Sequence, residues 1–360
     1  MKTDVNPVSP RLARAHIPAR QPVRVTIRHV AAAARVSVQT VSRVINNHPD
    51  VSDATRAQVQ QIVAKLSYRP NGIARSLITQ TSHTLGVVAS GFQLYGPAQL
   101  LTGIEREATA LGWQLLLQIV DPHKPNDYER VTSNLISQNV DGVIWAYPEL
   151  TGERERAFYK QVQPFAKIVF LSMEPLPGSP VLSMDNRLGA RLATEHLIRR
   201  GFRHIGLVSG PKPLWSSAQR KLGWEDALIA AKLAHGPRQL VEGDWSSASG
   251  DAGLTRLLQQ SPKLDAVFAS NDQMALGVLK AAHRLGRRVP KDLGVVGFDD
   301  MPESAYFSPA LTTVHHDLSQ LGQLAVRELS RSLQTAREEL PVAAPISLVL
   351  QPWLVVRESA

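Results

Sequence analysis

The chain has 360 residues, of which 43% are hydrophobic and 20% charged, which is typical of a globular protein with room for more than one domain. Its net charge of +9 is concentrated in the N-terminal segment. Residues 1–80 hold 12 Lys and Arg against 3 Asp and Glu, whereas residues 81–360 hold 28 basic and 28 acidic residues. The absence of cysteine excludes disulfides, thiolate catalysis and cysteine-based zinc sites.

The first 24 residues are rich in proline and arginine and contain no apolar run of the kind found in secretory signals. We predict a disordered basic arm over residues 1–24, which either adds non-specific phosphate contacts or has no role. No later stretch approaches the 18 or so consecutive apolar residues of a membrane-spanning helix. We therefore expect a cytoplasmic protein.

Three short helices are predicted within residues 25–69. The first is capped by Thr26 and runs to Ala34, the second is capped by Ser37, and the third opens at Ser52. The link between the first two is as short as a helix-turn-helix requires. Because the excess positive charge lies on this same segment, we predict an all-α headpiece that reads DNA.

The second of these helices has an apolar inner face formed by Val41, Val44 and Ile45 at helical spacing. Arginine can donate two hydrogen bonds to guanine, and glutamine or asparagine can pair with adenine, in the major groove. An ordinary amphipathic surface helix would show the same pattern, so only the neighbouring helices favour DNA reading. The polar outer face consists of Gln39, Ser42, Arg43 and Asn46.

The segment resembles the DNA-binding headpiece of the lactose/galactose repressor (LacI/GalR) family of bacterial transcriptional regulators. That resemblance implies further DNA contacts from Thr26, Ser37, Val38 and Thr40. Val38 replaces a base-reading tyrosine of the family, so the operator sequence is not implied. The matching motifs are Val25-Thr26-Ile27, Val36-Ser37-Val38, Thr40-Val41-Ser42-Arg43-Val44, Tyr68-Arg69-Pro70-Asn71 and Ala74-Arg75-Ser76-Leu77.

Residues 70–82 are predicted to form a hinge helix and linker. Pro70 disfavours helix at the residue before it, and the helix that follows is too short to be stable alone in water. In the resembled family this helix folds on the operator, pairs with its dimer mate and inserts a leucine into the minor groove, which kinks the duplex. The resemblance gives that role to Leu77, with Asn71 and Ala74 beside it; the alternative is a plain linker.

From Thr84 onward, short apolar runs alternate with helical patterns, which predicts parallel sheets covered by helices on both faces. Two such sets in series indicate an α/β core of two subdomains over residues 83–360, and the resemblance implies a periplasmic-binding-protein-like fold. We expect the N-subdomain at about 83–184 and 318–345, and the C-subdomain at about 185–317 and 346–360. The predicted strands are 85–88, 114–117, 142–145, 168–171, 205–208, 266–269, 294–297 and 346–350, and the predicted helices are 97–111, 128–138, 188–200, 220–234, 250–259 and 273–285.

Ligands of open α/β sheets bind at the carboxyl ends of the strands, so the cleft between the subdomains is the predicted site. Asn271-Asp272 and Asp299-Asp300 follow strands, Arg220 is expected to open a helix, and Trp245 lies in a short polar loop. Such residues offer hydrogen bonds to sugar hydroxyls and a ring for the apolar face of a sugar. Each has a plainer alternative: a helix cap for Asp272 or Asp300, a core residue for Trp245, and a surface charge for Arg220.

The core resembles sugar-responsive, lactose-type members of the same family up to about Leu350. The resemblance implies that Arg220, Asn271 and Asp299 bind sugar hydroxyls and that Trp245 stacks on the ring. Its matching stretches are Leu94–Leu100, Gly243–Ser246, Asn271–Gly277 and Val295–Asp300. The predicted effector site is Leu94, Gly96, Pro97, Leu100, Ser172, Arg220, Trp245, Asn271, Gln273, Asp299 and Leu318.

Two positions of this site depart from the lactose-type pattern. Ser172 stands where an aspartate is expected, and Leu318 where a phenylalanine is expected, so the sugar is not identified. After the predicted strand 346–350 only ten residues remain, and they include no counterpart of the tetramerising helix of the lactose-type pattern. We therefore expect a homodimer on a palindromic operator.

The sequence thus predicts a DNA-binding repressor of sugar-utilisation genes, released by a galactoside or another oligosaccharide. One alternative is a family regulator with a purine or other small molecule as co-repressor, and another is a sugar-binding protein without a role on DNA. An enzyme is disfavoured by the absence of GxSxG, GxGxxG, P-loop and HExxH motifs. His315-His316 are adjacent and would project apart, and of Asp299-Asp300 we expect one carboxylate in the cleft and the other capping a turn. We expect no cofactor and no metal.

Overall fold

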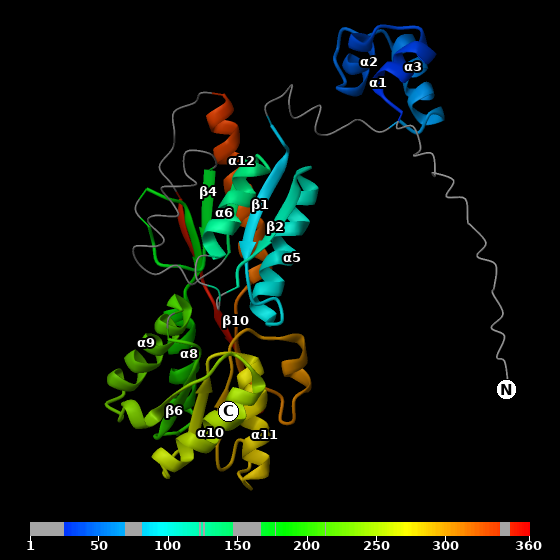
Figure 1. The fold of residues 1–360 in the computed structure, drawn as a ribbon. Coiled ribbons are helices and arrows are strands. Elements are labelled where there is room, and N and C mark those ends of the chain that lie inside the picture. Colours follow the sequence, from blue (N-terminus) through cyan, green and yellow to red (C-terminus); the bar gives the residue numbers. More distant parts are fainter. Residues whose placement is uncertain are drawn as a thin grey trace, which may run out of the picture. The chain divides into compact units, whose positions relative to one another are not determined.

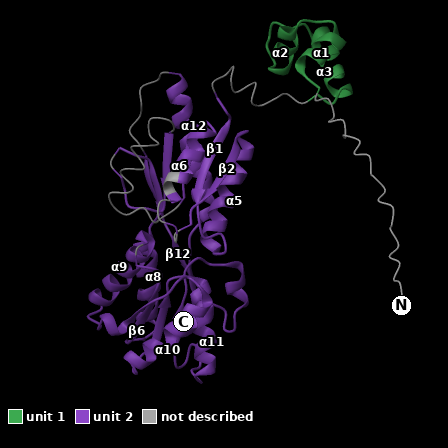
Figure 2. Cartoon of the chain, in the orientation of Figure 1, with its two compact units in different colours: residues 1–78 green, residues 79–360 purple. Residues whose placement is uncertain are grey.

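The computed structural model describes residues 25–68, 81–121, 124, 127–146, 167–176, 178–212, 214–338 and 346–360. The chain consists of two compact units, residues 1–78 and residues 79–360 (Figure 2). The predicted basic arm and the predicted hinge helix, with Asn71, Ala74 and Leu77, lie outside the described residues.

Three helices form the described part of the first unit (Figure 1). Two of them begin with a serine cap, because Ser37 Oγ accepts the amide of Thr40 at 3.0 Å and Ser52 Oγ accepts the amide of Thr55 at 3.3 Å. The predicted helix-turn-helix is therefore confirmed. The helices are α1 (Ile27–Ala34), α2 (Val38–Ile45) and α3 (Asp53–Lys65).

The headpiece has its own apolar core. Val41 and Val44, the predicted inner face of α2, are 0% and 3% exposed. The small side chains of Ala31 and Ala34 let α1 approach its neighbours closely, and Gln58 of α3 donates to the carbonyl of Ala34 at 3.0 Å. Burial on this scale lets three short helices fold together, although each would be unstable alone.

The second unit contains two parallel sheets covered by helices (Figure 1). The first sheet has six strands in the order β11-β5-β4-β3-β1-β2. Its strands are β1 (Thr84–Ala89), β2 (Gln114–Ile119), β3 (Gly142–Trp145), β4 (Lys167–Leu171), β5 (Val181–Met184) and β11 (Ser347–Leu350). The described helices of this subdomain are α5 (Tyr95–Ala110), α6 (Asp127–Ser137) and α12 (Leu318–Arg337). Helices α5 and α12 pack tightly, because a Cβ at Gly103 of α5 would collide with the backbone of Ser319.

The second sheet has four strands in the order β7-β6-β8-β9. Its strands are β6 (Ile205–Ser209), β7 (Leu240–Glu242), β8 (Ala266–Ala269) and β9 (Gly294–Val296). The helices around it are α8 (Asn186–Arg199), α9 (Trp215–Ala230), α10 (Ser247–Gln260) and α11 (Asp272–Arg284), with 3-10 turns η1 (Pro237–Gln239) and η2 (Pro302–Tyr306). Strands β6 and β8 are buried along their whole length, as continuous apolar runs in parallel sheets are.

Among the described residues the chain passes between the two subdomains three times. It does so between β5 and α8, between β10 (Thr313–His315) and α12, and between β11 and β12 (Trp353–Val355). Strands β10 and β12 pair antiparallel with each other beside the second sheet. No helix in the described ranges is long and apolar enough to cross a membrane.

The structure differs from the predicted elements at the start of one helix and at one strand, and the strand changes a subdomain boundary. Helix α9 begins at Trp215 rather than at Arg220, because its N-cap, Leu214, offers no side-chain signal of a helix start. Strand β11 pairs with β5 in the first sheet, so only the residues after Leu350 return to the second subdomain. The elements absent from the prediction are β5, β7, β10, β12 and α12.

Candidate functional site

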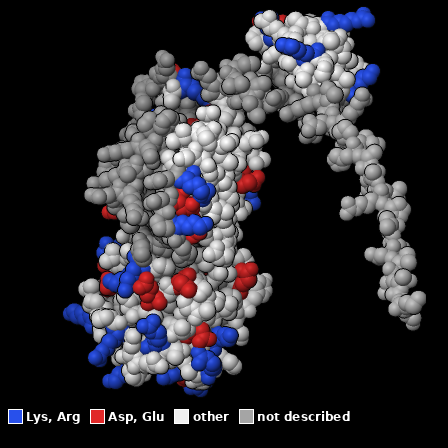
Figure 3. Space-filling model, viewed as in Figure 1, with Lys and Arg blue, Asp and Glu red and all other residues white. Residues whose placement is uncertain are grey.

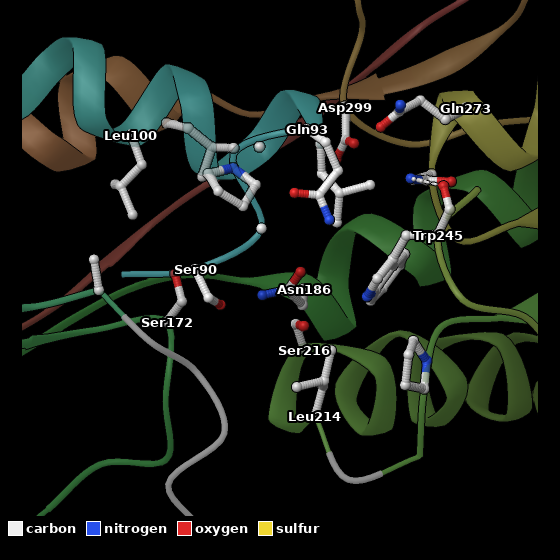
Figure 4. A pocket seen from close by; sticks show the side chains of 18 of the residues that line it. Ser90, Gln93, Leu100, Ser172, Asn186, Leu214, Ser216, Trp245, Gln273 and Asp299 are labelled. Atoms are coloured by element: carbon white, nitrogen blue, oxygen red, sulfur yellow. Dashed lines mark hydrogen bonds between the residues drawn. The ribbon is translucent and has the colours of Figure 1, made fainter. Parts of the chain in front are cut away.

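A cavity of about 700 Å³ lies in the second unit, where the carboxyl ends of both sheets meet (Figure 4). Of the ten parallel strands described, nine contribute a lining residue at their last position or within three residues after it. This is where open α/β sheets bind ligands, and the volume is in the range of small-molecule sites. The residues at the strand ends are Ser90, Val120, Ala146, Ser172, Met184, Pro211, Asp244, Asn271 and Asp299.

All residues of the predicted effector site line this one cavity. They are Leu94, Gly96, Pro97, Leu100, Ser172, Arg220, Trp245, Asn271, Gln273, Asp299 and Leu318. Sequence reasoning did not single out several polar residues that also line it, namely Ser90, Gln93, Asp121, Asn186, Ser216, Asp244 and His316. Position directly after a strand is the signal that could have identified Ser90 and Asp121.

Arg220 is buried in the cavity wall rather than exposed, so its plainer alternative as a surface charge is wrong. Its Nε donates to Asn186 Oδ1 at 2.8 Å, and its Nη1 donates to the carbonyl of Ser270. The guanidinium lies over the ring of Phe298 at 3.7 Å, and Nη1 is 3.7 Å from Asp299 Oδ1. Burial lowers the pKa of Arg220 to about 10, against the opposing effect of Asp299, so the side chain stays cationic at neutral pH.

His316 approaches the same carboxylate oxygen, with its Nε2 2.9 Å from Asp299 Oδ1. The histidine side chain is 2% exposed, and burial lowers its pKa, although the hydrogen bond to Asp299 opposes that shift. A neutral ring must then donate its Nε2 proton to the carboxylate, since only a donor can face it. Its Nδ1 is left as an acceptor with no partner among the described residues.

Trp245 lines the cavity and is partly exposed there, while it also packs against the core of the second sheet. Its ring lies against Gly210, where a Cβ would collide with it. Asn271 holds the tryptophan loop from the other side, because Asn271 Nδ2 donates to the Trp245 carbonyl at 3.0 Å. The same amide caps α11, with Oδ1 accepting the amide of Met274 at 2.8 Å. Figure 4 shows the indole of Trp245 across the cavity from Ser90 and Ser172.

Three lining residues have left-handed backbone conformations that side-chain-bearing residues rarely adopt. The φ angles are +56° at Ser172, +72° at Trp245 and +115° at Asp299. Each such residue costs about 1–3 kcal/mol, and such residues cluster at ligand sites. The cavity wall therefore holds its functional side chains in positions that the surrounding structure must stabilise.

Asp272 is fully buried and does not cap the helix, a role that Asn271 takes. Its carboxyl group accepts the amide of Met301 at 2.9 Å and the hydroxyl of Ser304 at 2.7 Å, and it also bonds to Thr313 Oγ1. Burial, and secondarily Asp299, raise the pKa of Asp272 to about 7. Asp272 thus ties α11 to the loop that presents Asp299.

Only one of the two adjacent aspartates behaves as predicted. Asp299 lines the cavity. Asp300 caps no turn, because it accepts from Arg357 Nη2 at 2.7 Å and lies 2.9 Å from His315 Nδ1. Strands β10 and β12 bring those two partners to it from distant parts of the sequence, which spacing alone does not reveal. Among the described residues no cluster of His, Asp and Glu is suited to a metal.

On the headpiece, the predicted outer face of α2 is accessible. Gln39, Arg43 and Asn46 are exposed, and Ser42 is partly exposed and 3.4 Å from Asn46 Nδ2. Val38 is 42% exposed at the start of the helix. The other candidate contacts, Thr26, Ser37 and Thr40, lie at or near the starts of α1 and α2, and the Thr26 amide donates to His29 Nδ1 at 3.2 Å.

The headpiece is also basic where it is described. Residues 25–68 contain five Arg and Lys against two Asp, and Figure 3 shows these cations on its visible surface. Arg56 of α3 is held by Asn47 Oδ1 at 3.1 Å and the His48 carbonyl at 2.7 Å, which fixes the loop after α2. Arg43 has no partner within this described stretch, so its guanidinium is available for an external acceptor.

Comparison with known proteins gives two matching families. Residues 26–71 match the bacterial regulatory proteins of the lacI family, and residues 194–360 match the periplasmic binding protein-like domain. The lactose operon repressor of Escherichia coli (strain K12) is 33% identical over 325 residues, which cover 90% of this chain and 89% of that protein.

Two solved structures resemble the chain over nearly its whole length. A lac repressor dimer bound to operator and the anti-inducer ONPF has a TM-score of 0.83 at 33% identity, covering 93% of this chain and 98% of that one. A complex of the transcriptional regulator CelR with cellobiose has a TM-score of 0.70 at 30% identity, covering 94% of this chain and 100% of that one.

Proposed function

Because the chain belongs to the lacI family of bacterial regulatory proteins, we propose that it is a cytoplasmic, dimeric repressor that binds a palindromic operator and is released by a sugar. The genes that it controls would then be those for use of that sugar. The observation that carries the proposal is the cavity itself, since the predicted sugar-binding residues come from both subdomains and line one space.

The DNA-binding part of the proposal is supported by the headpiece. The exposed amide and guanidinium groups of Gln39, Arg43 and Asn46 suit base edges in the major groove. The basic surface around them suits phosphate groups, which position the reading helix. A single short helix contacts few base pairs, so a two-fold dimer on a palindrome would double the contacts.

The sugar-binding part is supported by the chemistry of the cavity wall. Trp245 offers an aromatic face, and Arg220, Asn271 and Asp299 offer fixed donors and acceptors beside it. An apolar wall of Leu94, Pro97, Leu100 and Leu318 faces them. A pyranose presents hydroxyls at its edge and C–H groups on its faces, so it needs this combination.

The coupling between the two parts follows from the position of the cavity between the subdomains. A ligand that contacts both can favour one arrangement of them over another, and it shifts the equilibrium only by that difference in affinity. In our proposal, sugar binding closes or twists the subdomains. This movement separates the hinge segments around Leu77 of the two protomers and so lowers the affinity for the operator.

The test is a thermal-shift screen of the full chain with mono- and disaccharides and with purine bases, followed by anisotropy of labelled DNA taken upstream of its own gene. We expect a sugar to stabilise the protein and to release it from that DNA, but not from random duplex. Arg220→Ala should bind the operator normally and lose the response. A protein that prefers no duplex over random competitor, with or without sugars, contradicts the proposal.

A further inference from the structure

The cavity has little positive charge available to a ligand. Among the described residues that line it, Arg220 is the only arginine or lysine, whereas three are carboxylates: Asp121, Asp244 and Asp299. His316 also lines the cavity, but burial lowers its pKa, and it donates a proton to Asp299 as a neutral ring. Whether the cavity wall offers positive charge to a ligand therefore depends on whether the guanidinium of Arg220 can bind that ligand.

The charge of Arg220 is already matched within the protein. Its Nε and Nη1 donate to Asn186 and to the Ser270 carbonyl, one face lies on the Phe298 ring, and Asp299 is 3.7 Å away. Remaining N–H groups can donate to a hydroxyl. If they turned to an added anion, the buried carboxylate of Asp299 would lose its cation, which is costly for a buried charge.

Helix N-termini are the other source of positive potential in such a cavity. Helices α8 and α11 are capped by side chains, Asp185 and Asn271, and α11 also carries the carboxyl group of Asp272 in its first turn. In α5, the amide of Tyr95 donates to Gln273 Oε1 at 3.3 Å, and Pro97 has no N–H to offer. Among the described helices that reach the cavity, only α9 begins without a side chain that accepts its first amides.

Two further carboxylates line the cavity, Asp244 and Asp121. Asp244 is exposed, and hydrogen bonds from Ser246 lower its pKa, so it is ionised at neutral pH. Asp121 lies 3.3 Å from Lys124, which balances it. Among the described lining residues, an anion would therefore meet carboxylates and no cation that lacks a carboxylate partner.

We propose that the effector is an uncharged carbohydrate and that the cavity rejects phosphorylated sugars; this rests on the proposed function. A phosphoryl group carries about −1.5 to −2 at neutral pH, and burying it without a cation forfeits its hydration. Sites that select phosphates use forked arginines, lysines or several free backbone amides.

Neutral groups suited to hydroxyls lie at both ends of the cavity. Ser90 and Ser172 lie together at one end, and Trp245 and Gln273 lie at the other, with Asn186 between them (Figure 4). A molecule with hydroxyls at both ends matches this distribution. The inferred class is therefore an uncharged glycoside of at least two sugar units.

The first experiment compares matched pairs on the full chain, using lactose, cellobiose and trehalose with the 6-phosphates of each, and glucose with glucose 6-phosphate. Dissociation constants come from calorimetry, and operator release from anisotropy. We expect every hit to be uncharged and its phosphate to bind at least about tenfold more weakly, a difference of about 1.4 kcal/mol. A phosphorylated sugar that binds as tightly as its parent, or more tightly, overturns the inference.

A second experiment uses inorganic phosphate as the probe, with an uncharged sugar found in the first experiment as the competitor. Ser90→Arg places a cation at the end of the cavity, and Ser90→Gln is the uncharged control. At constant ionic strength, phosphate should raise the Tm of Ser90→Arg but not that of the native chain or Ser90→Gln. Equal stabilisation of all three proteins, abolished by an uncharged sugar that binds the cavity, overturns the inference.

The two proposals fail in different ways. If an uncharged sugar binds the cavity and leaves the operator complex intact, the repressor mechanism is wrong and the charge selectivity stands. If a sugar phosphate binds preferentially and releases the operator, the repressor mechanism stands and the charge selectivity is wrong.

Discussion

Replacing Arg220 by methionine removes the cation that lies against Asp299 while filling much of the same space. Two hydrogen bonds from a charged donor are lost, to Asn186 and to the Ser270 carbonyl. Hydrogen bonds to charged groups contribute about 1.5–3 kcal/mol each, and removing one partner of a buried ion pair costs about 3–5 kcal/mol. Because His316 still donates to Asp299, we expect Arg220→Met to lower the free energy of unfolding by about 3 kcal/mol.

The assay is urea unfolding at pH 7, followed by tryptophan fluorescence. All six tryptophans lie within residues 79–360, so the signal reports the second unit alone. Asp299→Asn removes the carboxylate that Arg220→Met leaves without a cation. The double variant should therefore be more stable than the sum of the single losses predicts, by at least about 1 kcal/mol.

The control is Arg288→Met, which breaks the ion pair with Asp292 on the surface. The Arg288 side chain is 71% exposed, so solvent screens that pair and its loss should change stability very little. If the losses of Arg220→Met and Asp299→Asn add to within about 0.5 kcal/mol, the two side chains are not coupled and the reasoning about the cavity wall is refuted.

Three further predictions concern the headpiece, the cavity and pH. Arg43→Ala should weaken operator binding by about 1–3 kcal/mol and relax one base position in a binding-site selection, whereas equal weakening on random duplex would make Arg43 a phosphate contact. Gly210→Ala puts a Cβ into the Trp245 ring, so sugar affinity measured by calorimetry should fall while operator affinity is kept; unchanged sugar affinity would argue against stacking. The pKa of Asp272 is raised from 3.8 to about 7, so the stability that this group contributes is greatest below about pH 4 and is lost as pH rises through 7. Between pH 4 and 7 the native chain should therefore lose up to about 4 kcal/mol relative to Asp272→Asn in urea titrations, and parallel pH profiles would contradict this.

The sequence predicted the location of the site because strand ends are easy to recognise. The strand Ala266–Ala269 is a buried apolar run, and the polar pair Asn271-Asp272 directly after it must lie at the carboxyl edge of the sheet. The roles of the two residues could not be assigned in the same way. Asn271 caps helix α11, whereas Asp272 is buried and accepts hydrogen bonds from Ser304 and Thr313. These two partners are distant in the sequence, so the sequence pattern alone does not assign the two roles.

Other differences have equally local causes. Helix α9 has no capping residue at Leu214, so its first turn carries no signal, and Arg220 was expected to begin the helix that in fact begins at Trp215. His316 was considered only as half of a poor metal pair. Its place in the cavity depends on β10, a three-residue strand whose partner comes from the end of the chain, and no periodic pattern identifies a strand that short.

The three passages of the chain between the subdomains limit how the receptor can respond. A single connection would let one subdomain move in any direction relative to the other. Three connections allow only those movements that are compatible with all three. Inserting one residue between β11 and β12, the passage that contributes no residue to the cavity lining, should thus uncouple ligand binding from any change at the headpiece. The path of the backbone, as much as the ligand, therefore sets which relative movements of the two subdomains are possible.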